Sequence, residues 1–367
     1  MKLHAPEAAP ANPAPDRERL QVALREGAAL ASTFESRNAL RSVGEALRLA
    51  RRLRDPRAEA QSLVLATQCH YQRGDYVAAV ATGLDACATY SDNDLEGRSH
   101  VFHSVALAFF SVAELRRAEA AARRAIRYAS DEHESLAEAT ARSTLAYVLC
   151  DSGQFDEALL ELRRARARFR KLGDELRVKK ATSNAGHVWR KRGIAFAAER
   201  DADAARRGWQ KAMRYYRAAL NIGRSRLDDA IILGSLGESA LRLGRFHEAI
   251  AHLDAAAELT GPRDAARIVG HIALRRGQAE HALNRGAAAE RHLRLALEQA
   301  DALGNDDLAS EARAALAQLC DDRGEGAQAR EWRDERLRQI EARREALAGF
   351  RRQMRPLWDD FLKGSDD

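Results

Sequence analysis

The chain has 367 residues, with 60 Lys or Arg against 54 Asp or Glu and a formal net charge of +6. Its four cysteines are scattered without a Cys-x-x-Cys spacing, which argues against a disulfide framework or a zinc site and predicts reduced thiols in a cytoplasmic protein. No apolar run reaches the roughly 18 residues that a membrane span requires. Alanine, leucine and arginine dominate, so the composition predicts stacked helices rather than sheets.

The N-terminal segment differs in composition from the rest of the chain. It is rich in alanine and proline and lacks the apolar core of a secretion signal. We therefore expect a disordered tail over 1–16. The sequence patterns then divide the chain into a repeat region over 17–325 and a C-terminal segment over 326–367.

Two sets of small residues recur through the repeat region. The intervals of the first set are 40, 39, 40, 40, 51, 40 and 40 residues, and the second set keeps step with it. The first set is Gly27, Thr67, Ala106, Ala146, Gly186, Gly237, Gly277 and Ala317; the second is Ala39, Ala79, Ala118, Ala158, Ala249, Ala289 and Ala329. This double repeat predicts about eight copies of one supersecondary unit, stacked as a solenoid.

The stretch 137–169 shows what each copy contains. Apolar residues at helical spacing lie on both sides of Gly153, which predicts two antiparallel helices joined by a short turn. Where the two helices cross, as at Ala146, a small residue is needed because a larger side chain would push them apart.

The turns repeat a Gly-x-aromatic pattern, followed by alanine three residues later, at Gly74-Asp75-Tyr76, Gly153-Gln154-Phe155 and Gly244-Arg245-Phe246. Together with Leu236-Gly237, Ala249, Leu253 and Ala256, this pattern resembles the tetratricopeptide repeat family, in the form with about 40 residues per repeat found in kinesin light chains and bacterial peptide-responsive regulators. The resemblance implies an all-α, right-handed superhelical solenoid of antiparallel helical hairpins that binds proteins or peptides. Thr67 and Gly83 depart from the pattern, which has a small and a large residue at these places.

The single 51-residue interval follows Gly186. The distance from this residue to Ala212, which continues the second set, is 26 residues instead of 12, an excess of 14. Because 14 is two heptads, each helix could gain about seven residues without rotating its buried face. We expect an extended helical hairpin at about 187–212 that protrudes by roughly 10 Å, with a disordered loop as the alternative.

After Ala329 a helical pattern continues without a turn signal to about Phe350. We expect this long helix to cap the exposed end of the last repeat. A short amphipathic tail follows at Pro356–Leu362. We expect the tail to dock on the repeats, and the alternative is a segment that binds a partner or inhibits the protein itself.

The resemblance also implies where a ligand would bind, since the first helix of each hairpin lines a concave groove in tetratricopeptide arrays. Offsets from each crossing residue give the candidate protein- or peptide-binding residues: Gln68, Tyr71, His100, His103, Phe110, Ser143, Tyr147, Lys180, Ser183, Asn184, His187, Arg190, Lys191 and Arg242. The same offsets add further lining residues: Gln61, Gln72, Ser104, Leu107, Thr140, Thr144, Ser235, Glu238, His271, Gln278 and His281.

The centre of this groove is polar and basic. Asn184 could exchange two hydrogen bonds with a peptide backbone, while Lys180, Arg190 and Lys191 could pair with carboxylates. Between Arg163 and Leu227 there are 20 Lys or Arg against 5 Asp or Glu, a local charge of +15. This charge favours an acidic protein or peptide as partner, because it would steer such a partner toward the groove.

Other functions find less support in the sequence. Nucleic-acid binding by the basic segment 163–227 is the main alternative, since its Lys and Arg are interleaved with aromatic residues. His100 and His103 share a helix face but have no third metal ligand at motif spacing. Cys150 beside Asp151, and Ser143 near His133, are the nucleophile-like neighbours in the sequence. Neither pair lies in a Gly-rich strand–turn–helix segment or a phosphate-binding loop. We therefore expect a non-enzymatic scaffold or regulator without cofactor or metal, acting on a separate effector protein.

Overall fold

The computed structural model describes residues 13–32, 36–73, 75–89, 95–129, 136–260 and 266–363. All regular structure in these ranges is helical, as the composition predicts. No helix among the described residues is long and apolar enough to cross a membrane.

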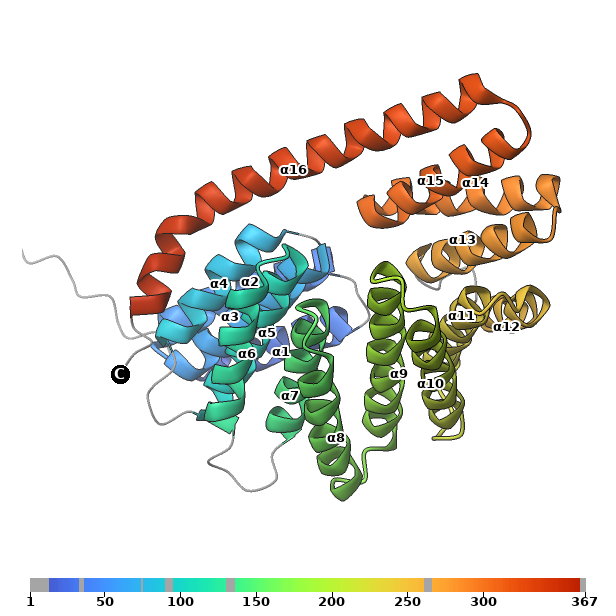
Figure 1. Ribbon diagram of the computed structural model, residues 1–367. Helices are drawn as coiled ribbons and strands as arrows, with labels where there is room; N and C mark the ends of the chain where they lie inside the picture. The colour runs from blue at the N-terminus through green and yellow to red at the C-terminus, as the bar shows by residue number, and fades with distance from the viewer. Residues whose placement is uncertain are drawn as a thin grey trace, which may run out of the picture. The chain divides into compact units, whose positions relative to one another are not determined.

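The helices follow one another through short connections (Figure 1). They are α1 (Pro13–Ser32), α2 (Ser36–Leu53), α3 (Pro56–Arg73), α4 (Tyr76–Thr89), α5 (Leu95–Ser111), α6 (Leu115–Ala129), α7 (Leu136–Asp151), α8 (Phe155–Lys171), α9 (Glu175–Ala198), α10 (Ala202–Leu220), α11 (Arg226–Arg242), α12 (Phe246–Leu259), α13 (Ala266–Ala282), α14 (Gly286–Leu303), α15 (Asp306–Asp322) and α16 (Gly326–Lys363).

The helices form two compact units. The first comprises the chain up to Val148 and its end from Gln353, and the second comprises Leu149–Arg352. Helices α7 and α16 each contribute residues to both units.

Both ends of the chain are more helical than the sequence patterns suggest. Helix α1 begins at Pro13, inside the range 1–16 that we expected to be a disordered tail. A proline is compatible with a helix start, because its missing N–H would have no partner in the first turn. Helix α16 continues through Pro356 to Lys363, so the segment expected as a separate tail is part of the same helix.

Three hairpins of the second unit are closed by a close approach between a small residue on one helix and a larger one on the other. A methyl group added to Gly186, Gly237 or Gly277 would lie 2.8, 2.6 or 2.7 Å from the side chain of Tyr216, Leu253 or Leu293. In each pair the larger residue fills the space that the glycine leaves. The three larger partners are fully buried, which places these crossings in the core.

The two departures from the repeat pattern occur at the same crossing. Thr67 is fully buried on α3, and its hydroxyl donates to the carbonyl of Leu63 at 2.8 Å. Gly83 on α4 faces it, since a methyl group there would lie 3.5 Å from the Thr67 Cγ2. The larger residue has therefore moved to the first helix and the smaller one to the second, so the crossing stays filled.

The fifth hairpin consists of α9 and α10, which pack along each other and have 24 and 19 residues (Figure 1). Helix α9 runs 12 residues past Gly186, whereas α11 runs 5 past Gly237. The turn between them contains Arg200 in the left-handed region (φ 64°), and the Asp201 side chain caps α10 by accepting from the Ala204 N–H. The extra residues thus lengthen both helices.

The odd-numbered helices form the inner layer of each unit. In the second unit α9 contacts α11, α11 contacts α13, and α13 contacts α15. No such contact joins α10, α12 and α14 in the part of the chain that the structure describes. Because the layer with the closer spacing lies on the inside of a curved stack, the odd-numbered helices present the concave face.

The glycine at position 208 provides a test of the close helix crossing. A methyl group there would lie 2.8 Å from the Cα of Gly193, which is backbone and has no flexible end that can move aside. We expect Gly208→Ala to lower the free energy of unfolding by about 1–3 kcal/mol, measured by urea denaturation. The control is Gly44→Ala in α2, where nothing lies within 4 Å and alanine should stabilise by about 0.5–1 kcal/mol. Equal effects of both substitutions would contradict the close approach.

Candidate functional site

The fourteen candidate residues are divided between the two units. Seven belong to the first unit: Gln68, Tyr71, His100, His103, Phe110, Ser143 and Tyr147. The other seven belong to the second: Lys180, Ser183, Asn184, His187, Arg190, Lys191 and Arg242. All of them lie on odd-numbered helices, and none is fully buried.

In the first unit, the candidate residues His103 and Ser143 contact polar groups of the same unit. The His103 ring Nδ1 lies 3.0 Å from the Thr144 hydroxyl oxygen. Burial, with a smaller contribution from His100, lowers the pKa of His103 to about 4, so its imidazole is neutral at pH 7. The Ser143 hydroxyl donates to a carbonyl of its own helix, and His133, which we considered beside it, lies outside the described residues.

In the second unit the predicted cations already have carboxylate partners. Lys180 Nζ lies 3.7 Å from Asp228, and Lys191 Nζ lies 3.1 Å from Asp151. Arg190 donates to Glu238 at 2.7 Å. Each of the three cations thus lies beside an acidic residue of a neighbouring odd-numbered helix. That they pair with a ligand carboxylate stays a prediction, and such a ligand would compete with these acidic neighbours.

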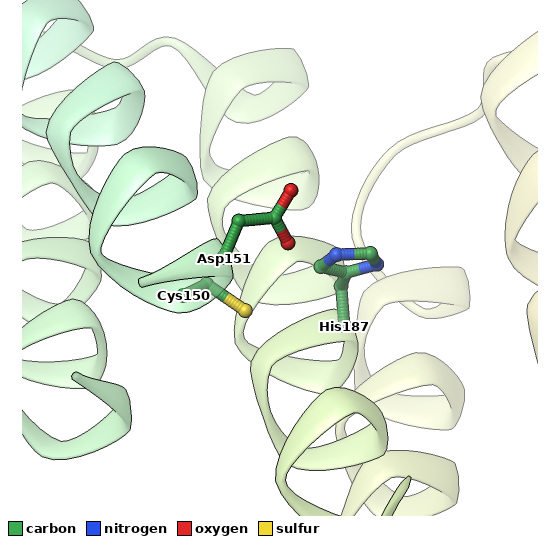
Figure 2. Close-up of side chains that lie close together, drawn as sticks. All are labelled: Cys150, Asp151 and His187. Carbon is green, nitrogen blue, oxygen red and sulfur yellow. The ribbon is translucent and has the colours of Figure 1, made fainter. Parts of the chain in front are cut away.

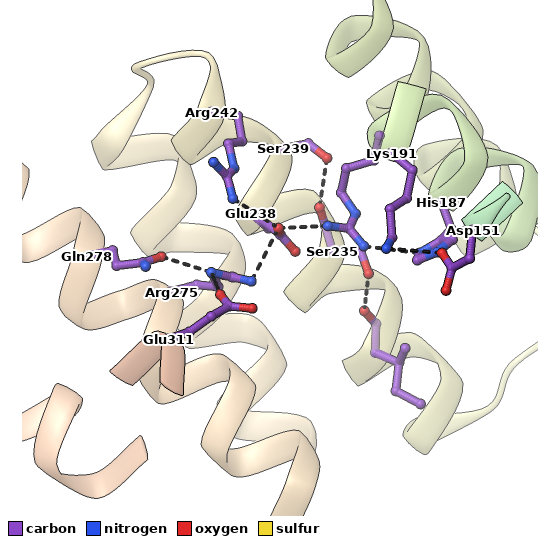
Figure 3. A network of polar contacts seen from close by, with 12 residues as sticks. Asp151, His187, Lys191, Ser235, Glu238, Ser239, Arg242, Arg275, Gln278 and Glu311 are labelled. Carbon is purple, nitrogen blue, oxygen red and sulfur yellow. Dashed lines mark hydrogen bonds and ion pairs between the residues drawn. The ribbon is translucent and has the colours of Figure 1, made fainter. Parts of the chain in front are cut away.

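These pairs extend into a row of alternating charges across four inner helices (Figure 3). Arg190 on α9 pairs with Glu238 on α11, and Glu238 lies 3.4 Å from Arg275 on α13. Arg275 donates to Glu311 on α15 at 2.7 Å and to Gln278 at 3.1 Å. We call Arg190, Glu238, Arg275 and Glu311 the inner charge row.

Glu238 is the centre of this row. It is only 8% exposed and accepts from Arg190, while Arg275 and Arg242 lie 3.4 and 3.9 Å away. Burial by itself would raise the pKa of Glu238, but the three guanidinium groups lower it to about 2. Glu238 in turn raises the pKa of Arg190, against the effect of burial. Arg190 and Glu238 are therefore both charged at neutral pH.

Arg242 is the member of this cluster with the weakest attachment. Its contact with Glu238 is the longest of the three, and its side chain is 41% exposed. Since Glu238 is shared by three guanidinium groups, positive charge is in excess at this point. Arg242 is thus the most exposed and least tightly paired guanidinium of this cluster.

The sequence reasoning missed Arg275 and Glu311 and did not select Glu238 among its binding residues. Arg275 stands two residues before the crossing residue Gly277, as Asn184 stands two before Gly186. A search for opposite charges about one repeat apart could have found these residues.

Cys150, Asp151 and His187 come together where α7 ends beside α9 (Figure 2). One ligand-type atom from each lies within 4.8 Å of the others. Burial raises the pKa of the Cys150 thiol to about 12, and burial with Arg190 and Lys191 lowers the pKa of His187 to about 3. Thiol and imidazole are therefore both neutral at pH 7, so they do not form the thiolate–imidazolium pair of a cysteine nucleophile.

A metal ion at this cluster would compete with two cations. Arg190 Nη2 lies 3.0 Å from the His187 Nδ1, and Lys191 lies 3.1 Å from Asp151. Both positive charges oppose a divalent ion. The cluster fits better as the end of the polar inner face than as a metal centre.

The inner face also carries exposed aliphatic side chains. Leu176 on α9 and Leu227 and Ile231 on α11 are each at least 40% exposed. Helical spacing places Leu227 and Ile231 on the same stripe of α11 as Glu238 and Arg242. The face therefore carries exposed aliphatic side chains only near the starts of α9 and α11, beside the Lys180–Asp228 pair, and charged side chains toward their ends.

The neutral His187 predicts a dependence of stability on pH. Its pKa is about 3 in the folded protein against 6.5 ordinarily, so the unfolded chain binds the proton more readily. This contribution to stability is complete above about pH 6.5 and is lost as the pH falls toward 3. We expect it to cost about 2 kcal/mol of unfolding free energy between about pH 7 and about pH 5.

His187→Gln should remove this part of the loss, as measured by urea denaturation at both pH values. The control is His247→Gln, because His247 is exposed on α12. If the loss between the two pH values is as large in His187→Gln as in the native chain, the buried neutral imidazole is not its source.

No protein-family model and no curated protein sequence matches the chain. Among solved structures, the Rap conjugation gene regulator of plasmid pLS20, complexed with a Phr peptide, is 12% identical over 89% of this chain and 96% of its own, with a TM-score of 0.60. A Rap protein complexed with Competence and Sporulation Factor is 14% identical over 91% and 100%, with a TM-score of 0.56. A tetratricopeptide repeat protein from Parabacteroides merdae is 11% identical over 80% and 99%, with a TM-score of 0.50. The predicted architecture is confirmed: the chain has the fold of a tetratricopeptide-like helical repeat protein.

Proposed function

We propose that this protein is a non-enzymatic regulator or scaffold that binds a peptide or an extended protein segment on the inner face of its second unit. The observation that carries the proposal is the inner charge row. It holds charged side chains of the four inner helices α9, α11, α13 and α15 in fixed positions on the concave layer. A surface ordered in advance loses little conformational freedom when it binds a ligand.

The proposed ligand combines an acidic group with aliphatic side chains. Arg242, with its exposed guanidinium in a region of excess positive charge, would hold the carboxylate. Leu227 and Ile231, on the same stripe of α11, would contact the aliphatic side chains. Asn184 and Ser183 on α9 would hydrogen-bond the ligand backbone.

Two further observations support this proposal. Structures with the same fold include Rap proteins complexed with a Phr peptide and with Competence and Sporulation Factor. All four cysteines of this chain are free thiols, as expected of a protein that acts in the reducing cytoplasm. We propose that a separate effector protein responds to the ligand.

Selection from a random peptide library tests the proposal. We expect native protein to enrich peptides that contain Asp or Glu together with Leu, Ile or Val. Arg242→Glu should weaken the binding of a selected peptide on the order of tenfold or more in fluorescence anisotropy, because it places a like charge opposite the carboxylate.

The matched control is Arg245→Glu, three residues further along the chain. Arg245 is also exposed, but it stands at the N-terminal end of α12 and pairs with Glu248, away from the inner face. If the affinity of the selected peptides changes equally in both variants, or in neither, the inner face of α11 is not the binding site.

A further inference from the structure

The cations of the basic segment 163–227 fall into two groups. On α9, every Lys and Arg has a carboxylate partner within the second unit: Arg177, Lys179, Lys180, Arg190, Lys191 and Arg192 pair with Asp174, Asp229, Asp228, Glu238, Asp151 and Asp156. The six cations of α9 are therefore compensated by nearby carboxylates, and the uncompensated part of the local charge of +15 lies outside this helix.

Helix α10 carries the clearest group of uncompensated cations. Arg206, Arg207 and Arg214 are exposed, and their side chains have no hydrogen bond, ion pair or ring contact with other described residues. Lys211 is exposed too, and its Nζ lies 4.0 Å from the centre of the Trp189 ring, a contact that leaves its charge in place. Helical spacing puts these four residues on one side of α10, within about 140° around its axis. We call them the α10 ridge.

The ridge lacks the features that binding to a protein or a membrane requires. No large apolar residue of α10 is exposed, whereas a protein interface needs an apolar core. An amphipathic helix that lies in a membrane surface likewise inserts apolar side chains, and α10 has none exposed on the ridge. The only carboxylate of the helix is Asp203, in its first turn. Cations without apolar neighbours suit a ligand that offers only negative charges along a line.

Base stacking is also unavailable on the ridge. The aromatic residues of α10 are Trp209, Tyr215 and Tyr216, and each stands more than about 100° around the helix axis from the centre of the ridge. A single strand bound without stacking would lose the main source of its affinity for proteins. The backbone of a duplex, by contrast, is bound through its phosphates alone.

We propose that the α10 ridge binds the phosphate backbone of a nucleic-acid duplex without sequence preference. The contacts are ion pairs from Arg206, Arg207, Lys211 and Arg214 to phosphate oxygens. The site is on the outer layer and does not share residues with the proposed peptide site. The two activities can therefore be lost separately.

Fluorescence anisotropy with a labelled DNA duplex of about 20 base pairs and mixed sequence tests this proposal. With four phosphates neutralised, raising the salt from about 0.05 M to about 0.2 M should weaken binding on the order of 100-fold. The triple variant Arg206→Gln, Arg207→Gln and Arg214→Gln should reduce the slope of log affinity against log salt by about 3. The corresponding Glu variant should lose binding altogether.

A control with the same change of charge is available in the same unit. Arg285, Arg291 and Arg338 are exposed, and their side chains likewise have no hydrogen bond, ion pair or ring contact with other described residues. Their triple substitution by Glu should leave duplex binding within about twofold of native once the long-range effect is screened by salt. Circular dichroism and thermal unfolding check that all variants fold, which the exposure of the replaced side chains favours.

Several results would overturn the proposal. The proposal is wrong if the native protein does not bind the duplex at low salt. It is also wrong if the ridge variant and the control variant lose the same amount of duplex affinity. Binding of poly-glutamate or of phosphatidylserine vesicles that depends on the ridge, without binding of the duplex, would assign the ridge to another partner. Loss of peptide binding by Arg242→Glu with intact duplex binding would leave the ridge assignment standing.

Discussion

The close crossing of the two helices in each hairpin is the constraint on which the rest of the structure depends. A crossing can be this close only if one side of it has almost no side chain, as at Gly186 opposite Tyr216 and Gly237 opposite Leu253. The crossing stays filled even where the large and the small residue exchange places, as at Thr67 and Gly83. Packing of this density leaves little freedom for the helices to shift.

The close packing also explains the inner charge row. Because the odd-numbered helices contact one another, long polar side chains on one helix reach the next, and Arg190, Glu238 and Arg275 become mutual partners. Such buried charges contribute little net stability, since desolvation offsets much of their attraction. Their effect is to fix the positions of polar groups across four helices. A concave surface made in this way differs from one lined by mobile surface side chains.

The sequence allowed much of the fold to be predicted and less of the site. The 40-residue period and the 14-residue excess follow from glycine and alanine positions, which the helix crossings restrict strongly. The state of the cations could not be read in the same way, because burial and pairing depend on residues about one repeat away, such as Asp151 for Lys191 and Asp228 for Lys180. A local count of +15 includes Lys179, which is 1% exposed and paired with Asp229, and Arg206, which is exposed without a partner. Counting treats these two residues alike.

The separation of paired and unpaired cations has a physical consequence for how the two layers interact with their surroundings. The Arg190–Glu238 and Glu238–Arg275 ion pairs of the inner charge row are largely shielded from solvent, so dissolved salt screens them weakly. The exposed cations of α10 are screened within about 10 Å at roughly 0.1 M salt, and their effect depends strongly on ionic strength. Positive charge near Gly186 and positive charge on α10 belong to one basic segment of the sequence. In the fold, the paired cations of α9 help to maintain the shape of the concave surface. The exposed cations of α10 create a positive potential on the outer layer. A single hairpin, α9 with α10, therefore supports two electrostatically distinct faces, and its lengthening enlarges both.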